Sequence, residues 1–137
     1  MPNLGGILES SIYVDNLNRS VEFYQSIFQW QAMERDDRLC AFNVSGRQVF
    51  LVFRRGGTVN SINTESGVIP GHDGSGQTNV AFSIAQSDLS KWEAWLREKG
   101  VTIESQKEWP GGGQSLYFRD PDGHLLELAT PGTWSIY

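Results

Sequence analysis

The chain is most informative at Gly112-Gly113-Gln114-Ser115-Leu116-Tyr117-Phe118-Arg119-Asp120-Pro121-Asp122-Gly123-His124-Leu125-Leu126-Glu127-Leu128. Its centre is a strong turn signal, because proline pre-sets φ, aspartate accepts hydrogen bonds from the following backbone and glycine tolerates positive φ. The apolar and aromatic runs on either side predict two strands joined by this turn. Glu127 interrupts the second strand. A carboxylate in a half-buried strand needs a cation, a hydrogen-bond donor or a metal beside it.

Length and composition narrow the class of protein. The 137 residues suffice for one domain with a hydrophobic core, and we expect a single domain over residues 1–137. A formal net charge of -5, with no basic cluster beyond Arg54 and Arg55, argues against a nucleic-acid partner. Cys40 is the single cysteine, so we expect a buried thiol and a reducing compartment such as the cytoplasm. Neither a signal peptide nor an apolar run typical of a membrane span is found.

The first half of the chain predicts a strand, a helix and three further strands. We expect them at residues 7–14, 17–28, 31–35, 39–44 and 48–54, with a helix cap at Asp15-Asn16. Alternation along the first strand places Glu9, Ser11 and Tyr13 together on the face that the helix leaves uncovered. Residues 55–77 are rich in Gly, Ser and Asn, and we expect them to form a long connection.

The second half repeats this plan. We expect a strand at residues 79–84, a helix from about Leu89 to Gly100, a strand at 101–105 and then the strand–turn–strand segment described above. Ser90 and Glu93 have the spacing of a capping box at the start of the helix. Two modules of about 7–54 and 78–130 follow, each with a helix on one face of a mostly antiparallel sheet. Their uncovered faces could meet in a shared groove.

The segments Ile12–Tyr24, Asn79–Phe82 and Tyr117–Leu128 resemble the vicinal oxygen chelate superfamily. This superfamily includes glyoxalase I, extradiol dioxygenases, fosfomycin-resistance thiol transferases and bleomycin-resistance proteins. The resemblance covers about residues 7–131 and is most specific at 120–127. It implies an α+β fold in which two βαβββ modules form a curved, incomplete barrel around a groove. It also implies a homodimer.

The resemblance places metal ligands at Glu9, Asn79 and Glu127. Asn79 stands where metal-using members carry His, and a fourth position falls near Leu51, which cannot bind a metal. Carboxylate and amide oxygens suit Mg²⁺, Mn²⁺ or Ca²⁺ better than Zn²⁺ or Fe²⁺. We therefore expect a divalent metal (Mn²⁺, Ni²⁺, Zn²⁺ or Mg²⁺) to bind weakly or not at all. Glu9 and Glu127 are also the candidate catalytic residues, since either carboxylate could act as a base.

The alternation of side chains along the strands and the family resemblance together indicate which side chains meet a small-molecule ligand: Ser11, Tyr13, His72, Ser115, Tyr117 and Arg119. Two alternatives stay open. His72 either closes over the groove or remains an exposed loop residue, and Arg119 either binds an anionic group or forms a surface ion pair. His124 is predicted to be a solvent-facing turn residue.

Two functions remain open at this point. The first is a metal-dependent enzyme of glyoxalase type, a lyase, isomerase or transferase, that acts on a small oxygenated molecule. Extradiol ring cleavage is the least favoured chemistry, because neither position 9 nor position 79 is His. The alternative is a metal-free protein that binds and sequesters a small molecule in the groove.

Overall fold

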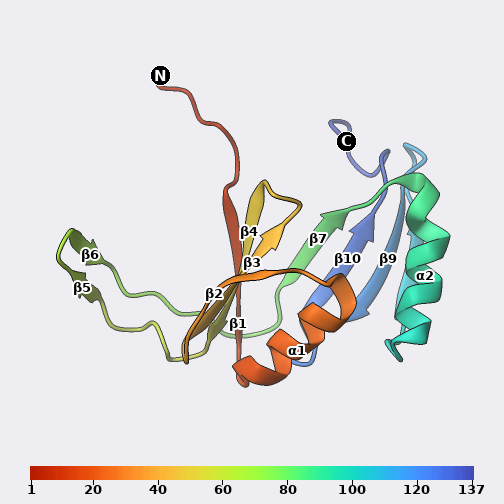
Figure 1. The fold of residues 1–137 in the computed structure, drawn as a ribbon. Coiled ribbons are helices and arrows are strands. Elements are labelled where there is room, and N and C mark those ends of the chain that lie inside the picture. Colours follow the sequence, from red (N-terminus) through yellow and green to blue (C-terminus); the bar gives the residue numbers. More distant parts are fainter. The chain divides into compact units, whose positions relative to one another are not determined.

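The computed structural model describes residues 1–137 (Figure 1). The strands are Glu9–Val14 (β1), Ala32–Arg35 (β2), Leu39–Val44 (β3), Gln48–Arg54 (β4), Ile62–Thr64 (β5), Gly67–Ile69 (β6), Asn79–Ser83 (β7), Ser105–Glu108 (β8), Gln114–Arg119 (β9) and Leu125–Ala129 (β10). The helices are Leu17–Phe28 (α1), the 3-10 turn Gln86–Asp88 (η1) and Leu89–Glu98 (α2). The chain forms two compact units, Met1–Gly76 (unit 1) and Gln77–Tyr137 (unit 2). No helix is both long and apolar enough to span a membrane.

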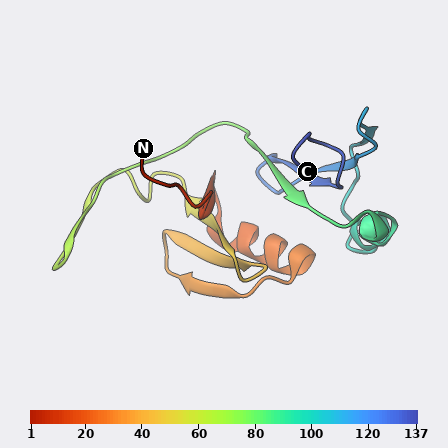
Figure 2. The same cartoon turned by 90° about the horizontal axis from the view of Figure 1, so that it is seen from above.

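Unit 1 contains a four-stranded sheet in the order β1-β4-β3-β2, in which only the β1–β4 pair is parallel. Helix α1 covers one face of this sheet (Figure 2). Ile12 and Val14 are fully buried toward that face. Glu9, Ser11 and Tyr13 alternate with them along β1, and their strand partners also point to the uncovered face. The predicted alternation in β1 is therefore confirmed.

Helix α1 begins and ends where the sequence predicts. The side chain of Asn16 accepts a hydrogen bond from the backbone N–H of Arg19 at 3.0 Å, which satisfies one of the free donors of the first turn. Gln29 ends the helix in the left-handed conformation with φ 54°. The apolar stripe of the helix is buried at Leu17, Val21, Tyr24 and Ile27.

Cys40 is buried on β3, as expected. Burial raises the pKa of its thiol, and the nearby positive charge of Arg35 opposes this shift only in part. The thiol therefore stays protonated at neutral pH and acts as a small apolar side chain.

Unit 2 contains a second four-stranded sheet in the order β7-β10-β9-β8. Strand β10 lies between β7, which is parallel to it, and β9, which is antiparallel to it. The turn between β9 and β10 has the predicted chemistry. Asp120 Oδ1 accepts hydrogen bonds from the backbone N–H groups of Asp122 at 3.0 Å and His124 at 2.9 Å. Gly123 has a positive φ of 84°.

The prediction that His124 faces solvent is wrong, because the side chain is only 1% exposed. Its Nδ1 accepts a hydrogen bond from the backbone N–H of Thr78 at 3.0 Å. A backbone N–H can only donate, so the neutral imidazole carries its proton on Nε2. His124 thus joins the β9–β10 turn to the residue that precedes β7.

A short hairpin of β5 and β6 interrupts the connection predicted at residues 55–77. It projects away from the sheet of unit 1 in both views (Figures 1 and 2). Strands of three residues are too short to show a period of two in the sequence. The turn between them is closed by Thr64 Oγ1, which donates to the carbonyl oxygen of Gly67 at 2.7 Å.

Two predictions in unit 2 are wrong in position. The strand predicted at 101–105 lies at Ser105–Glu108, because the N–H of Val101 still bonds the carbonyl of Leu96 and completes the end of α2. The predicted capping box does not form. Asp88 holds the N-cap position of α2, and Glu93 pairs with Arg97 at 2.5 Å instead.

The position of His124 leads to a prediction about stability. His124→Ala leaves the N–H of Thr78 without its acceptor next to a new cavity, so we expect the free energy of unfolding to fall by about 1–3 kcal/mol. Urea denaturation followed by circular dichroism measures this loss. His72→Ala, at an exposed position, is the control and should cost less. An equal or smaller effect of His124→Ala would contradict the structural role.

Candidate functional site

One face of the sheet in unit 2 is organised around Glu127. This residue lies on β10 between Ala81 of β7 and Tyr117 of β9, and its side chain is only 8% exposed. Directly paired residues of neighbouring strands point to the same face of a sheet. Ser115, Tyr117 and Arg119 therefore lie on the same face as Glu127, which the sequence alone left open.

One oxygen of Glu127 is held by two hydroxyl groups. Ser115 Oγ donates to Oε1 at 2.5 Å, and Tyr117 OH donates to the same oxygen at 3.1 Å. Ser115 Oγ accepts in turn from the indole Nε1 of Trp109 at 2.8 Å. No protein group donates to Oε2 of Glu127. The buried carboxylate thus has the donors that its position requires, and one oxygen remains available.

The surroundings of Tyr117 keep its phenol protonated. Burial raises the pKa of Tyr117, and the negative charge and hydrogen bond of Glu127 raise it further, while a hydrogen bond involving Ser115 opposes the shift. At neutral pH the hydroxyl therefore remains a donor to Glu127.

Asn79 lies on the same face of the same sheet. It pairs with Leu125, which is two residues before Glu127 on β10, and its side chain is exposed. The amide oxygen of Asn79 and Oε2 of Glu127 are both hard oxygen donors. This pair fits Mg²⁺ or Mn²⁺ and lacks the imidazole that favours Zn²⁺ or Fe²⁺. The structure contains no cluster of three or more His, Cys, Asp or Glu side chains arranged to hold a metal ion.

The uncovered face of unit 1 carries a second polar pair. Tyr13 OH lies 2.6 Å from Nδ1 of His72. The backbone of His72 is held by Thr58 in both directions, through N–H to the Thr58 carbonyl at 2.8 Å and from Thr58 Oγ1 to the His72 carbonyl at 2.7 Å. The ring of His72 also meets the edge of Phe53 at 4.8 Å between centroids. His72 is therefore held beside Tyr13 of β1 and Phe53 of β4 and remains exposed.

The surroundings of Tyr13 keep its phenol protonated. Burial raises the pKa of Tyr13, Ser11 opposes the shift through a hydrogen bond, and the charge of Asp73 raises the pKa further. The phenol proton is thus retained at neutral pH.

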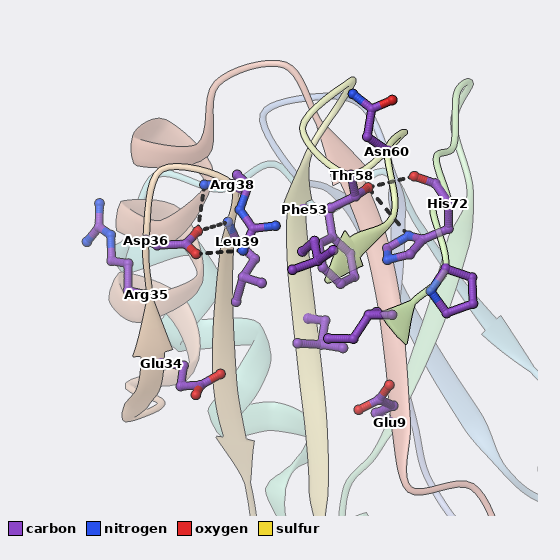
Figure 3. Close-up of a pocket in the computed structure, with 14 residues that line it drawn as sticks. Glu9, Glu34, Arg35, Asp36, Arg38, Leu39, Phe53, Thr58, Asn60 and His72 are labelled. Carbon is purple, nitrogen blue, oxygen red and sulfur yellow. Dashed lines mark hydrogen bonds and ion pairs between the residues drawn. The ribbon is translucent and has the colours of Figure 1, made fainter. Parts of the chain in front are cut away.

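A pocket of about 530 Å³ lies on this face of unit 1 (Figure 3). Leu39, Leu51 and Phe53 supply apolar surface, and His72 lies at its edge. The carboxylates of Glu9 and Glu34 also line the pocket, and neither has a hydrogen-bond partner in the protein. The pocket is lined further by Arg35, Asp36, Arg38, Thr58, Asn60, Ile62, Ile69 and Pro70.

Two of the charged residues that line the pocket form an ion pair with each other. Asp36 forms an ion pair with Arg38 at 3.0 Å, and the backbone N–H of Arg38, then the guanidinium, hold the pKa of Asp36 below its usual value. Arg35 donates to Asn18 at 2.6 Å. The pocket therefore combines an apolar wall with unpaired carboxylates.

The remaining predicted ligand contacts have other partners. Arg119 donates to both oxygens of Glu104 at 2.7 and 3.1 Å, which is the ion-pair alternative. Ser115 is fully buried, with its hydroxyl placed between Trp109 and Glu127. Trp109 is not among the site residues predicted from the sequence. No periodic signal indicates that its indole reaches Ser115.

The strand pairing identifies the residue of unit 1 that is equivalent to Glu127. Leu51 pairs with Ser11, two residues after Glu9, just as Glu127 pairs with Ala81, two residues after Asn79. Leu51 therefore occupies in unit 1 the place that Glu127 occupies in unit 2.

Comparisons with known proteins agree with this architecture. The family model of the Glyoxalase/Bleomycin resistance protein/Dioxygenase superfamily matches residues 6–128. The chain is 32% identical over 126 residues to the metallothiol transferase FosB of Bacillus licheniformis, covering 91% of this chain and 75% of that protein. A lactoylglutathione lyase from Agrobacterium tumefaciens has a similar structure, with a TM-score of 0.88 at 25% identity over 98% of this chain and 99% of that one.

The fold also matches the fosfomycin resistance protein FosX of Listeria monocytogenes, with a TM-score of 0.67 at 21% identity over 93% of this chain and 94% of that one. The predicted α+β class and the resemblance stated from the sequence are both confirmed.

The contacts of Tyr13 lead to a prediction about its ionisation. Asp73→Asn keeps an acceptor for the N–H of Gly56, which Asp73 Oδ1 binds at 3.1 Å, and removes a negative charge. Since that charge raises the pKa of Tyr13, we expect the pKa to fall but to stay above its ordinary value, because burial is the largest cause of the shift. A pH titration of the Tyr13 ring carbon by NMR measures it. An unchanged or higher pKa would contradict the assignment.

Proposed function

Because the chain belongs to the Glyoxalase/Bleomycin resistance protein/Dioxygenase superfamily, we propose that it binds a small oxygenated molecule and promotes, with a divalent metal, the addition of a thiol to it. The similarity to metallothiol transferases supports this class of reaction. The observation that carries the proposal is Glu127, a buried carboxylate with one oxygen held by two hydroxyls and the other available.

Asn79 and Glu127 of unit 2 would hold the metal. When bound, such an ion polarises an oxygen of the substrate as a Lewis acid. The oxygen donors favour Mn²⁺ or Mg²⁺, and the absence of imidazole from the set implies weak binding.

The pocket of unit 1 offers further contacts to a small molecule. Its residues Leu39, Leu51 and Phe53 suit an apolar part of such a molecule, and the imidazole of His72 suits a polar group. Glu9 and Glu127 are the candidate bases that take the proton of the thiol. A sulfur–carbon bond forms while a carbon–oxygen bond breaks, and the proton passes to the released oxygen.

A metal-free binding protein is the alternative. It is favoured by Asn79 and Leu51, which provide a weak donor and no donor at two of the family's metal positions. The pocket of unit 1, with its apolar wall and oriented His72, could hold a ligand without any ion.

Calorimetric titration of metal-stripped protein with Mn²⁺, Mg²⁺, Ni²⁺ and Zn²⁺ separates the two functions. We expect Mn²⁺ or Mg²⁺ to bind and Glu127→Gln to weaken that binding by about tenfold or more, because a charged ligand becomes neutral. Asn79→His should shift the preference toward Zn²⁺ and Ni²⁺.

Arg119→Gln is the matched control, since Arg119 shares the face of Glu127 but pairs with Glu104. It should leave metal affinity unchanged. If wild type binds no metal while Asn79→His does, the metal-dependent function is excluded and the metal-free alternative stands. If metal does bind, assays for thiol addition to epoxides and carbonyl compounds follow.

A further inference from the structure

The turn at residues 109–113 has no part in the function proposed above, yet its backbone is packed closely in unit 2. A Cβ atom on Gly111 would lie 2.5 Å from the carbonyl oxygen of Gly132, and one on Gly113 would lie 2.3 Å from the backbone nitrogen of Thr133. Such distances are too short for any side chain. The glycines therefore let this turn lie directly against residues 132–133.

Hydrogen bonds hold the turn in one conformation. The N–H of Trp109 donates to the carbonyl of Gly113 at 2.8 Å, and the N–H of Gly112, at a positive φ of 89°, donates back to the carbonyl of Trp109 at 2.9 Å. The neighbouring Gln114 N–H donates to Thr130 Oγ1 at 2.8 Å. Lys107 lies over the indole ring of Trp109 at 4.8 Å. The position of Trp109 is thus determined by backbone contacts on both sides of its turn.

The consequence is a directed chain of hydrogen bonds. An indole N–H can only donate, so Ser115 Oγ must accept from Trp109 at 2.8 Å. A serine hydroxyl has one proton, which is then directed to its other partner, Oε1 of Glu127, at 2.5 Å. Tyr117 OH donates to the same oxygen at 3.1 Å. Both donors converge on Oε1, and none reaches Oε2.

We propose that Trp109 and Ser115 are positioning residues. They hold Oε1 of Glu127 in a hydrogen bond and leave Oε2 as the single oxygen that meets the ligand. This gives Ser115 a role through Glu127, in place of the substrate contact predicted from the sequence. The identity of the ligand, a divalent cation, rests on the proposed function. The chain of hydrogen bonds does not.

The first test needs no metal. The indole resonance of Trp109 is identified among the five tryptophans by its loss in Trp109→Phe. Glu127→Gln replaces the charged acceptor of Ser115 with a neutral one, so we expect the Trp109 indole resonance to move by several linewidths. In a Ser115→Ala background the same substitution at Glu127 should leave that resonance in place. A purely structural role of Trp109 would produce no such dependence.

The second test measures the effect on the ligand. We expect Ser115→Ala and Trp109→Phe each to weaken Mn²⁺ binding by about tenfold or more, as loss of a group that orients a ligand does. Ser83→Ala is the matched control. Ser83 lies in the same cross-strand row, pairs with Ala129 beside Ser115, and is exposed. Trp134→Phe, at a 70% exposed tryptophan, is the control for Trp109. Both controls should keep wild-type affinity.

The outcomes separate the two proposals. If Glu127→Gln leaves the Trp109 indole resonance unchanged, the positioning role is overturned whatever the metal does. The comparison of wild type with Glu127→Gln needs no change at Ser115, so it stands even if Ser115→Ala does not fold. If the resonance moves but wild type binds no metal, the metal-dependent function fails and the positioning of Glu127 is supported. Unchanged Mn²⁺ affinity in both Ser115→Ala and Trp109→Phe would overturn the effect on the ligand.

Discussion

A carboxylate in the central strand of a sheet is the constraint on which unit 2 depends. Glu127 lies on β10 between two paired strands, where an unpartnered carboxylate would be costly. Its donors come from β9, so the pairing register must be correct. A slip of one residue would bring Leu116 and Phe118 to the face of Glu127 and turn both hydroxyls away. The Asp120 turn, with two hydrogen bonds to its own backbone, sets that register.

The sequence predicted most elements because each sheet has one covered face. A strand with one buried face alternates, and a helix on that face carries an apolar stripe, so β1 and α1 could be placed from their periods. Prediction failed where a contact with another part of the chain determines the local structure. The backbone N–H of Thr78 makes His124 a buried acceptor, and the end of α2 takes up Val101. Neither effect leaves a local pattern.

The candidate site divides in the same way. The alternation of side chains along a strand is enough to place Glu9, Ser11 and Tyr13 on one face of the sheet. Tyr13 meets His72 across 59 residues of sequence, and this contact depends on Thr58 holding the end of a loop. Trp109 reaches Ser115 because glycines allow two backbone segments to touch. Close backbone approach is invisible to hydrophobic periodicity, although three consecutive glycines are the signal that could have suggested it.

The two units share one topology and differ in chemistry. At equivalent positions on the uncovered faces, unit 1 has Leu51 and unit 2 has Glu127. Leu51 belongs to an apolar wall with Phe53, and its direct partner on β3 is Ala41, whose side chain has no donor. Glu127 has such donors on β9. The central strand of each sheet is therefore stabilised in a different way, by apolar packing in unit 1 and by side-chain hydrogen bonds in unit 2. Each unit thus offers a small molecule a different kind of surface, an apolar one in unit 1 and an oriented carboxylate in unit 2.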